Sequence, residues 1–188
     1  MKNRVFIKDL SSHVDSEILL SVWVHNRRDQ GKMIFLDMRD MTGLVQGVVL
    51  PNHTDALEIA KSLRSEWVVE IRGKVNKRPE RNIKEGEQNG DIELEILSIA
   101  VLNEAETPRF DVTTDGKEIG EESRLEYRYL DLRRPRMQKN LRMRHKIIKS
   151  IRDYLDQENF IEVETPILTK STPEGARDYI VPSRIYPG

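Results

Sequence analysis

Alternation of apolar and polar residues in short segments is the feature that most constrains how the first hundred residues of this chain can fold. Successive side chains of a β-strand point to opposite faces, so an alternating segment is typical of a strand with one buried face. A helix that Thr54 can cap, with apolar residues up to Leu63, divides these segments into two groups. The five predicted strands are residues 18–25, 33–40, 44–50, 67–75 and 92–96.

The order of three strands, one helix and two strands is that of the OB fold, a five-stranded Greek-key barrel. OB barrels bind oligonucleotides on the face of strands 2 and 3, with the loops between strands 1 and 2 and between strands 4 and 5. We expect these loops at residues 26–32 and 76–91, which are both rich in Arg, Lys, Asn and Gln. Other OB barrels bind proteins or sugars, so the order favours nucleic acid without establishing it.

The second part of the chain predicts a different organisation. Residues 104–125 are polar and acidic and read as a hinge or linker between domains. After Pro135 a helix is expected to about Glu158, closed by Asn159 in a left-handed conformation and followed by a strand at residues 160–164. One helix and one strand cannot bury a core by themselves, so residues 126–188 are expected to be the start of a truncated α+β domain behind a barrel domain at 1–103.

Composition and charge exclude some classes of protein and leave others open. The chain has no cysteine, which excludes disulfides and thiolate metal sites, and it has no run of 18 apolar residues that would predict a membrane span. We therefore expect a cytoplasmic protein without a membrane partner. The formal net charge is −1, yet residues 133–152 contain Arg and Lys without any acid. This basic block could contact phosphate or could be a solvated helix face, and the sequence leaves both open.

Phe35 is the first candidate for binding. It alternates with Ile34 and Leu36, so it should point away from the core, on the face that it shares with Asp37. An outward aromatic ring on an OB barrel can stack on an unpaired base, which contributes about 1–3 kcal/mol. The alternative is a ring that fills a gap against a neighbouring domain.

Gln46 and Glu93 are the candidates for reading base edges. Both alternate with apolar neighbours and should face outward. The Gln46 amide offers a donor and an acceptor, and the Glu93 carboxylate can accept a hydrogen bond from a cytosine amino group. Either residue could also be a plain surface side chain. Arg28 and Arg78, one in each predicted recognition loop, could contact phosphates or bases.

The residues alone indicate no catalytic arrangement. We find no nucleophile–base set, no metal cluster and no glycine-rich phosphate loop. Glu174 stands in a segment with Pro173 and Gly175 and could hold an ammonium group, although a simple loop acid is the plainer interpretation.

Five strings, in this order, resemble the bacterial-type aspartyl-tRNA synthetases, a family of class II aminoacyl-tRNA synthetases. The resemblance extends over essentially the whole chain. The strings are WVHNRRD at 23–29, IFLDMRD at 34–40, GLVQ at 43–46, YRYLDLRRP at 127–135 and TPEGARDY at 172–179.

The resemblance implies a role for each candidate on the barrel. Phe35 would stack on the central anticodon base, Gln46 would read that base as uridine, and Glu93 would read the third base as cytidine. The remaining residues that match anticodon-loop positions of the family are Arg28, Arg78 and Asn82.

The resemblance also implies an enzyme, a ligase that joins L-aspartate to tRNA(Asp) with ATP and Mg²⁺ as a homodimer. The helix after Pro135 and the strand ending at Pro166 resemble the first class II motif, which forms the dimer interface, and Glu174 would bind the ammonium group of aspartate. The second and third motifs, with the ATP-binding arginines, are absent. We therefore expect this chain to be an inactive N-terminal fragment without bound cofactor. The alternatives are a free-standing OB module that binds nucleic acid or protein, and a lysyl or asparaginyl relative.

Overall fold

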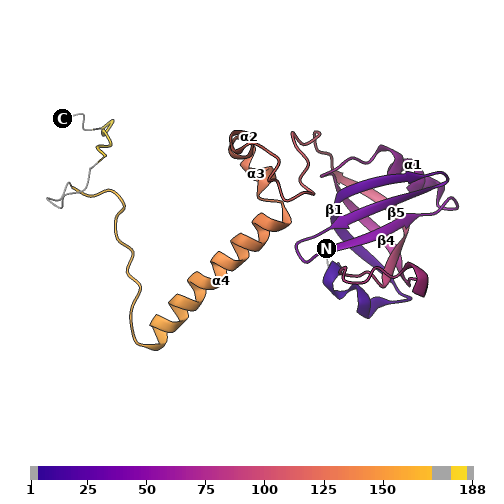
Figure 1. Ribbon diagram of the computed structural model, residues 1–188, viewed down its shortest axis with the longest axis horizontal. Coiled ribbons are helices and arrows are strands. Elements are labelled where there is room, and N and C mark those ends of the chain that lie inside the picture. Colours follow the sequence, from indigo (N-terminus) through magenta and orange to yellow (C-terminus); the bar gives the residue numbers. More distant parts are fainter. Residues whose placement is uncertain (1–3, 171–178, 186–188) are drawn as a thin grey trace. The chain divides into compact units, whose positions relative to one another are not determined.

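The computed structural model describes residues 4–170 and 179–185. The chain divides into two compact units, Met1–Lys139 and Asn140–Gly188. The first unit contains a closed barrel of five strands, which confirms the predicted OB architecture (Figure 1). The strands are β1 (Glu17–Gln30), β2 (Met33–Arg39), β3 (Leu44–Val49), β4 (Val68–Lys77) and β5 (Ile92–Asn103).

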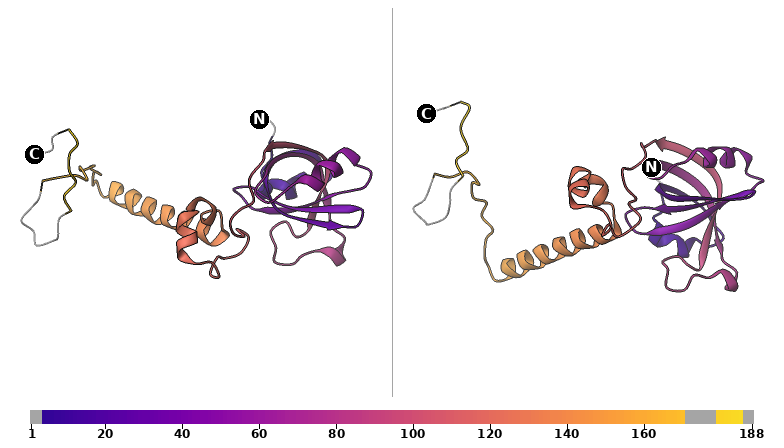
Figure 2. Two further views of the ribbon diagram at one scale, coloured as in Figure 1. Left: turned by 90° about the horizontal axis from the view of Figure 1, so that it is seen from above. Right: turned by 45° about the horizontal axis from the view of Figure 1, so that its top comes forward.

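The barrel closes because β5 pairs with two partners. The order around the barrel is β1-β2-β3-β5-β4, in which β4 returns to β1. All neighbours are antiparallel except β3 and β5, which are parallel where Gly47 faces Leu94. The left view of Figure 2 looks into the barrel and shows the strands closing into a ring. A Cβ atom at Gly73 would lie 2.7 Å from the backbone oxygen of Glu95, so this close approach of β4 and β5 requires glycine.

The core lies inside the ring and contains the inward half of each alternating strand. Ile34, Leu36 and Met38 of β2 are buried, and their neighbours Met33, Phe35 and Asp37 are only half-buried. Two further elements add side chains to the same core. They are the 3-10 helix η1 (Ile7–His13), which the sequence did not predict, and the helix α1 (Thr54–Ser62).

Three local predictions are wrong. Residues 26–30 continue β1 and pair with β2, so the first loop is only the turn at Gly31 and Lys32. Their polar side chains suggested a loop, but at the rim of a barrel a strand can be polar on both faces because its backbone is still paired. Thr54 does not cap α1: it is the first helical residue, and His53 occupies the N-cap without a side-chain hydrogen bond. β5 continues past residue 96 to Asn103 because β4 pairs with it throughout.

Residues after the barrel form two short helices around a buried carboxylate. α2 is Glu121–Glu126, and α3 is Arg128–Asp131. Asp131 is fully buried and accepts hydrogen bonds from Arg124 at 3.2 Å, Arg128 at 2.5 Å and Arg134 at 3.1 Å. Arg134 is also fully buried, and its guanidinium carbon lies 5.0 Å from the ring centre of Phe110. The string YRYLDLRRP therefore serves the packing of this region.

The second unit contains most of the helix α4 (Pro135–Gln157), close to the predicted bounds. Asn159 has a φ of 65°, and the Phe160 backbone N–H donates to the Leu155 oxygen, which confirms the predicted left-handed closure. The strand predicted at residues 160–164 is wrong, because this segment has no regular secondary structure. A strand needs a neighbour to accept its backbone hydrogen bonds, and the described part of the unit provides none. Within the described residues, no helix is long and apolar enough to cross a membrane.

Candidate nucleic-acid interface

The candidate side chains meet on the outer face of the barrel, where β1, β2, β3 and β5 are neighbours. In the β-ladders Arg28 pairs with Phe35, and Asp37 pairs with Gln46. Glu93 belongs to β5 one residue before Leu94, which faces Gly47, so Gln46 and Glu93 are neighbours on adjacent strands. Paired residues of neighbouring strands point to the same face of a sheet. The outward directions predicted for Phe35, Gln46 and Glu93 are therefore confirmed, whereas their roles stay predictions.

Arg78 links the two candidates for base reading. It follows the end of β4, and its side chain is only 5% exposed. Its Nη2 donates to Gln46 Oε1 at 2.6 Å and lies 3.6 Å from Glu93 Oε1. The sequence suggested a free loop arginine, whereas the structure places a nearly buried cation between an amide and a carboxylate.

Arg28 and Asp37 form a second polar pair on this face. Arg28 Nη2 donates to Asp37 Oδ1 at 2.9 Å, and both side chains remain partly exposed. An exposed pair of this kind has little net strength, so the arginine can exchange its carboxylate for a phosphate or a base edge at low cost. Sequence reasoning noted the outward direction of Asp37 but missed this contact, because it predicted residue 28 in a loop and not in a strand paired with β2.

The segment between β4 and β5 is held against the rest of the barrel. The 3-10 helix η2 (Glu80–Asn82) begins just after Arg78, and Asn82 is exposed. Asn89 Nδ2 donates to the backbone oxygens of Leu44 at 3.0 Å and Ile7 at 3.3 Å. These bonds fix the far end of the segment beside the start of β3. The predicted recognition loop is thus partly ordered and keeps Arg78 and Asn82 at the edge of the candidate face.

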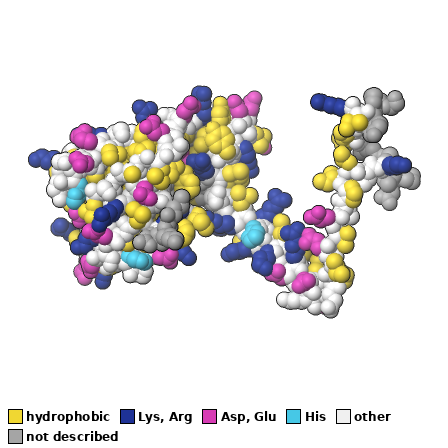
Figure 3. Space-filling view, turned by 180° about the vertical axis from the view of Figure 1, so that it is seen from behind, with side chains coloured by type: hydrophobic (Ala, Val, Ile, Leu, Met, Phe, Trp, Pro, Cys, Tyr) yellow, Lys and Arg dark blue, Asp and Glu magenta, His cyan; other side chains and the backbone are white. Residues whose placement is uncertain are grey.

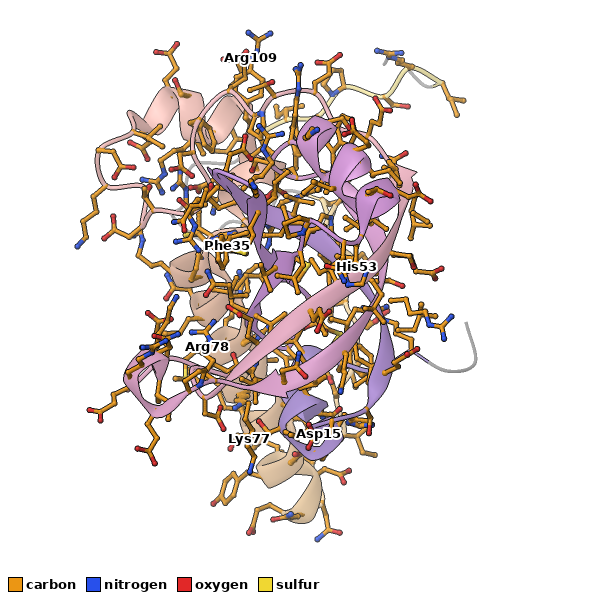
Figure 4. All side chains as sticks on the ribbon, turned by 90° about the vertical axis from the view of Figure 1, so that its right-hand side faces the viewer. Asp15, Phe35, His53, Lys77, Arg78 and Arg109 are labelled. Carbon is orange, nitrogen blue, oxygen red and sulfur yellow. The ribbon has the colours of Figure 1, made fainter. Side chains whose placement is uncertain are left out.

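A second polar cluster adjoins Glu93 on the outer face of the barrel. His53 contacts Glu95 at 3.0 Å, and Asn76 donates to the same carboxylate at 3.2 Å. The hydrogen bond with His53 is the largest influence on Glu95 and lowers the pKa of its carboxyl group. Figure 4 shows Phe35 and Arg78 on one side of the barrel and His53 on the other. The ladders nevertheless pair Asn76 with Glu93 and place Glu95 in line with Phe35 through Val48, so the His53 cluster borders the candidate face.

The basic block at 133–152 is partly neutralised. Arg133 bonds to Glu66, Lys149 to Asp153 and Arg152 to Glu162. Acidic and basic side chains are also interspersed over the face of the molecule seen in Figure 3. These pairs favour the interpretation of a charged, solvated surface over a continuous phosphate-binding strip.

Two predicted positions come after the barrel in the sequence. Pro166 is exposed and follows the segment that forms no strand. Glu174 lies outside the described residues.

Comparison with known sequence families matches two segments of the chain. Residues 18–102 match the family described as "OB-fold nucleic acid binding domain". Residues 120–188 match the family described as "tRNA synthetases class II (D, K and N)".

Individual relatives agree with both matches. An aspartate–tRNA(Asp/Asn) ligase of Halothermothrix orenii is 51% identical over 179 residues, which is 95% of this chain and 30% of that protein. An aspartate–tRNA ligase of Staphylococcus carnosus is 48% identical over 172 residues, 91% of this chain and 29% of that protein. The crystal structure of the asparaginyl-tRNA synthetase of Pyrococcus horikoshii with asparaginyl-adenylate has a TM-score of 0.78 and 28% identity, covering 93% of this chain and 39% of that one.

The chain thus spans about 30% of the length of the relatives that it matches. Three findings agree with one another: the chain forms a closed OB barrel, its later residues match class II synthetases, and about half of its residues are identical in aspartate–tRNA ligases. The chain belongs to the aspartyl-tRNA synthetase family.

Proposed function

We propose that the barrel of this chain reads the anticodon of tRNA(Asp) and that the chain is part of an aspartate–tRNA ligase. The observation that carries the proposal is the placement of Gln46 and Glu93 side by side on the outer face, one strand away from Phe35. An amide, a carboxylate and a half-buried ring are the groups that read and stack unpaired bases. The match of this segment to a nucleic-acid-binding family supports the same role.

Each group has a separate part in the proposal. Phe35 stacks on the central base, the amide of Gln46 identifies that base as uridine, and Glu93 accepts a hydrogen bond from the amino group of a cytidine at the third position. A carboxylate repels phosphate, so Glu93 has a direct use here only against a base edge. Arg28, Arg78 and Asn82 lie around these three and offer donors to the backbone or bases of the loop.

In the longer ligase, this barrel delivers its tRNA to a domain that joins L-aspartate to the tRNA with ATP and Mg²⁺ in the cytoplasm. Glu174 binds the ammonium group of aspartate, and the motif that contains α4 and Pro166 forms the homodimer. The ATP-binding arginines of the family belong to motifs outside this sequence, so no step of aspartate activation is assigned to residues of this chain.

A ligase that serves both tRNA(Asp) and tRNA(Asn) is the second candidate. Relatives that are 51% and 52% identical to this chain carry the name aspartate–tRNA(Asp/Asn) ligase. The two tRNAs differ in the third anticodon base, GUC against GUU, which is the base assigned to Glu93. The strength of this discrimination therefore separates the two candidates.

The test is the binding of the chain to anticodon stem-loops at fixed salt concentration, because affinity without a stated salt concentration cannot be compared. We expect a preference for GUC over a loop changed at the second base. Comparable binding of GUC and GUU identifies the dual ligase, and a preference for GUC identifies the tRNA(Asp)-specific one.

Two variants make the test specific. Glu93→Gln should lower the preference for cytidine at the third base, whereas Glu70→Gln, a partly buried glutamate on β4 away from the face, should leave it unchanged. Equal binding of the unchanged chain to every loop would exclude anticodon reading by this barrel.

A further inference from the structure

We infer that Arg78 fixes the orientation of the Gln46 side-chain amide and thereby decides whether the barrel prefers uridine or cytidine at the second anticodon base. The inference rests on the proposed anticodon reading by Gln46, and it assigns to Arg78 a positioning role that acts through another residue. Its basis is the contact of the Arg78 guanidinium with one end of the amide.

The orientation of a glutamine amide decides which pyrimidine it matches. Uridine presents an acceptor at O4 and a donor at N3, and cytidine presents a donor at N4 and an acceptor at N3. A glutamine side chain has one donor end and one acceptor end, so rotating it by 180° exchanges the pattern that fits uridine for the pattern that fits cytidine. A freely rotating Gln46 would accept both pyrimidines.

Arg78 removes this freedom because a guanidinium group can only donate. Its Nη2 lies 2.6 Å from Gln46 Oε1, a charge-assisted hydrogen bond. Rotation of the amide would bring the amino group against the guanidinium, two donors facing each other. Gln46 Nε2 has no protein partner among residues 4–170 and 179–185, so the amide presents a free donor end, which matches O4 of uridine and not the N4 amino group of cytidine.

The burial of Arg78 makes the orientation firm. The side chain is 5% exposed, and its Nε is buried without a hydrogen-bond partner in the described part of the chain. A buried cation with an unsatisfied donor is costly, which is typical of a group retained for a site and not for stability. Glu93, 3.6 Å away, supplies the countercharge from the other side. One arginine thus touches both residues that are proposed to read bases.

The inference is tested with the 188-residue chain and two stem-loops that differ only in the second base, GUC and GCC. The measured quantity is the ratio of the two dissociation constants. Arg78→Met removes the donor and keeps an apolar side chain of similar length, and we expect it to lower the preference for uridine by about tenfold. Arg78→Lys, which keeps a donor, should recover part of the preference.

A matched variant separates orientation from general attraction to RNA. Arg28→Met removes another arginine of the same face. Arg28 contacts Asp37 and does not contact Gln46. The substitution should weaken binding to both loops by the same factor and leave their ratio unchanged. An Arg78→Met chain that weakens both loops equally would overturn the inference.

If Arg78→Met does not fold, the inference can still be tested on the unsubstituted chain without RNA, by measuring how mobile the Gln46 amide is. The ¹⁵N relaxation of the Gln46 side-chain amide should indicate a group nearly as rigid as ordered backbone, whose order parameter is about 0.85, and a value below about 0.6 would overturn the inference. The failure of the proposed function has a different signature: the unsubstituted chain would then bind GUC and GCC equally.

Discussion

Arg39 and Glu66 form a two-point ion pair that joins the end of β2 to the turn before β4. Arg39 Nη1 and Nη2 donate to the two carboxylate oxygens at 2.5 and 2.7 Å, and the Glu66 side chain is 2% exposed. Arg133 Nη1 donates to the same carboxylate at 2.5 Å. Residues 39, 66 and 133 come from three separate parts of the first unit, so this contact ties the segment after α3 to the barrel.

The substitution Glu66→Gln should destabilise the chain by about 2–4 kcal/mol. It removes the charge of a buried carboxylate and leaves Arg39 without its counterion. An uncompensated charge in a buried position raises the free energy of the folded state. The measurement is the free energy of unfolding from urea denaturation. The exposed pair of Arg72 and Glu17 is the control, because Glu17→Gln should change the free energy by less than about 1 kcal/mol. An equal cost at both sites would contradict the prediction.

The same carboxylate predicts a pH dependence of stability. Burial by itself raises the pKa of Glu66, but the hydrogen bonds and charges of Arg39 and Arg133 outweigh it and lower the pKa below its ordinary value of 4.5. A lowered pKa in the folded state stabilises the protein above pH 4.5, and this contribution is lost as the pH falls through the folded-state pKa. The stability difference between the unsubstituted chain and Glu66→Gln should therefore be largest at neutral pH and shrink in acid. A difference that persists undiminished to pH 3 would exclude this origin.

Phe35→Ala should weaken binding of the GUC stem-loop by about tenfold to a hundredfold, because stacking on an aromatic ring contributes about 1–3 kcal/mol per base. The ring is half-buried, so the substitution should also lower the free energy of unfolding, by about 1 kcal/mol. Met33→Ala, on the same face of β2, is the matched control and should bind the loop almost as well as the unsubstituted chain. Identical losses at both positions would indicate a general effect of the surface and not stacking.

Asp131→Asn should open the region of α2 and α3 while the barrel stays folded. The change removes the charge that compensates Arg124, Arg128 and Arg134, and Arg134 is fully buried. Hydrogen exchange should show loss of protection at residues 121–134 and unchanged protection in β1 to β5. Asp115→Asn, at an exposed carboxylate paired with Lys117, should change neither region. Loss of protection throughout the barrel would show instead that the two regions unfold together.

The alternation of residues was sufficient to predict the barrel and the outward direction of Phe35, Gln46 and Glu93. A strand with one buried face imposes a period of two on its sequence, and that period can be read without the fold. The ends of strands were less predictable: polar residues at 26–30 suggested a loop, yet they pair with β2. At the rim, pairing of the backbone and not burial of the side chains determines where a strand ends.

The positions of the domain boundaries and the roles of the site residues remain predictions, and the resemblance to the family is what gave those roles. The strand predicted at 160–164 is wrong for a physical reason that applies to any such segment. A strand forms only when a neighbouring strand accepts its backbone hydrogen bonds. The alternating residues at 160–164 predict such a strand, but the described part of the chain contains no neighbour for it.

By itself, the sequence determined the order of the elements, the two faces of each strand and the identity of the groups that can read a base. The tertiary structure decided which of these groups touch. Arg78 and Gln46 are 32 residues apart, and Arg133 and Glu66 are 67 apart, yet each pair is in hydrogen-bonding contact. For the first pair the reason is closure of the barrel: β5 pairs with both β3 and β4, so the end of β4 lies one strand away from β3. The second pair forms because the segment after α3 contacts the turn before β4. No local pattern records a contact that depends on how distant strands pair.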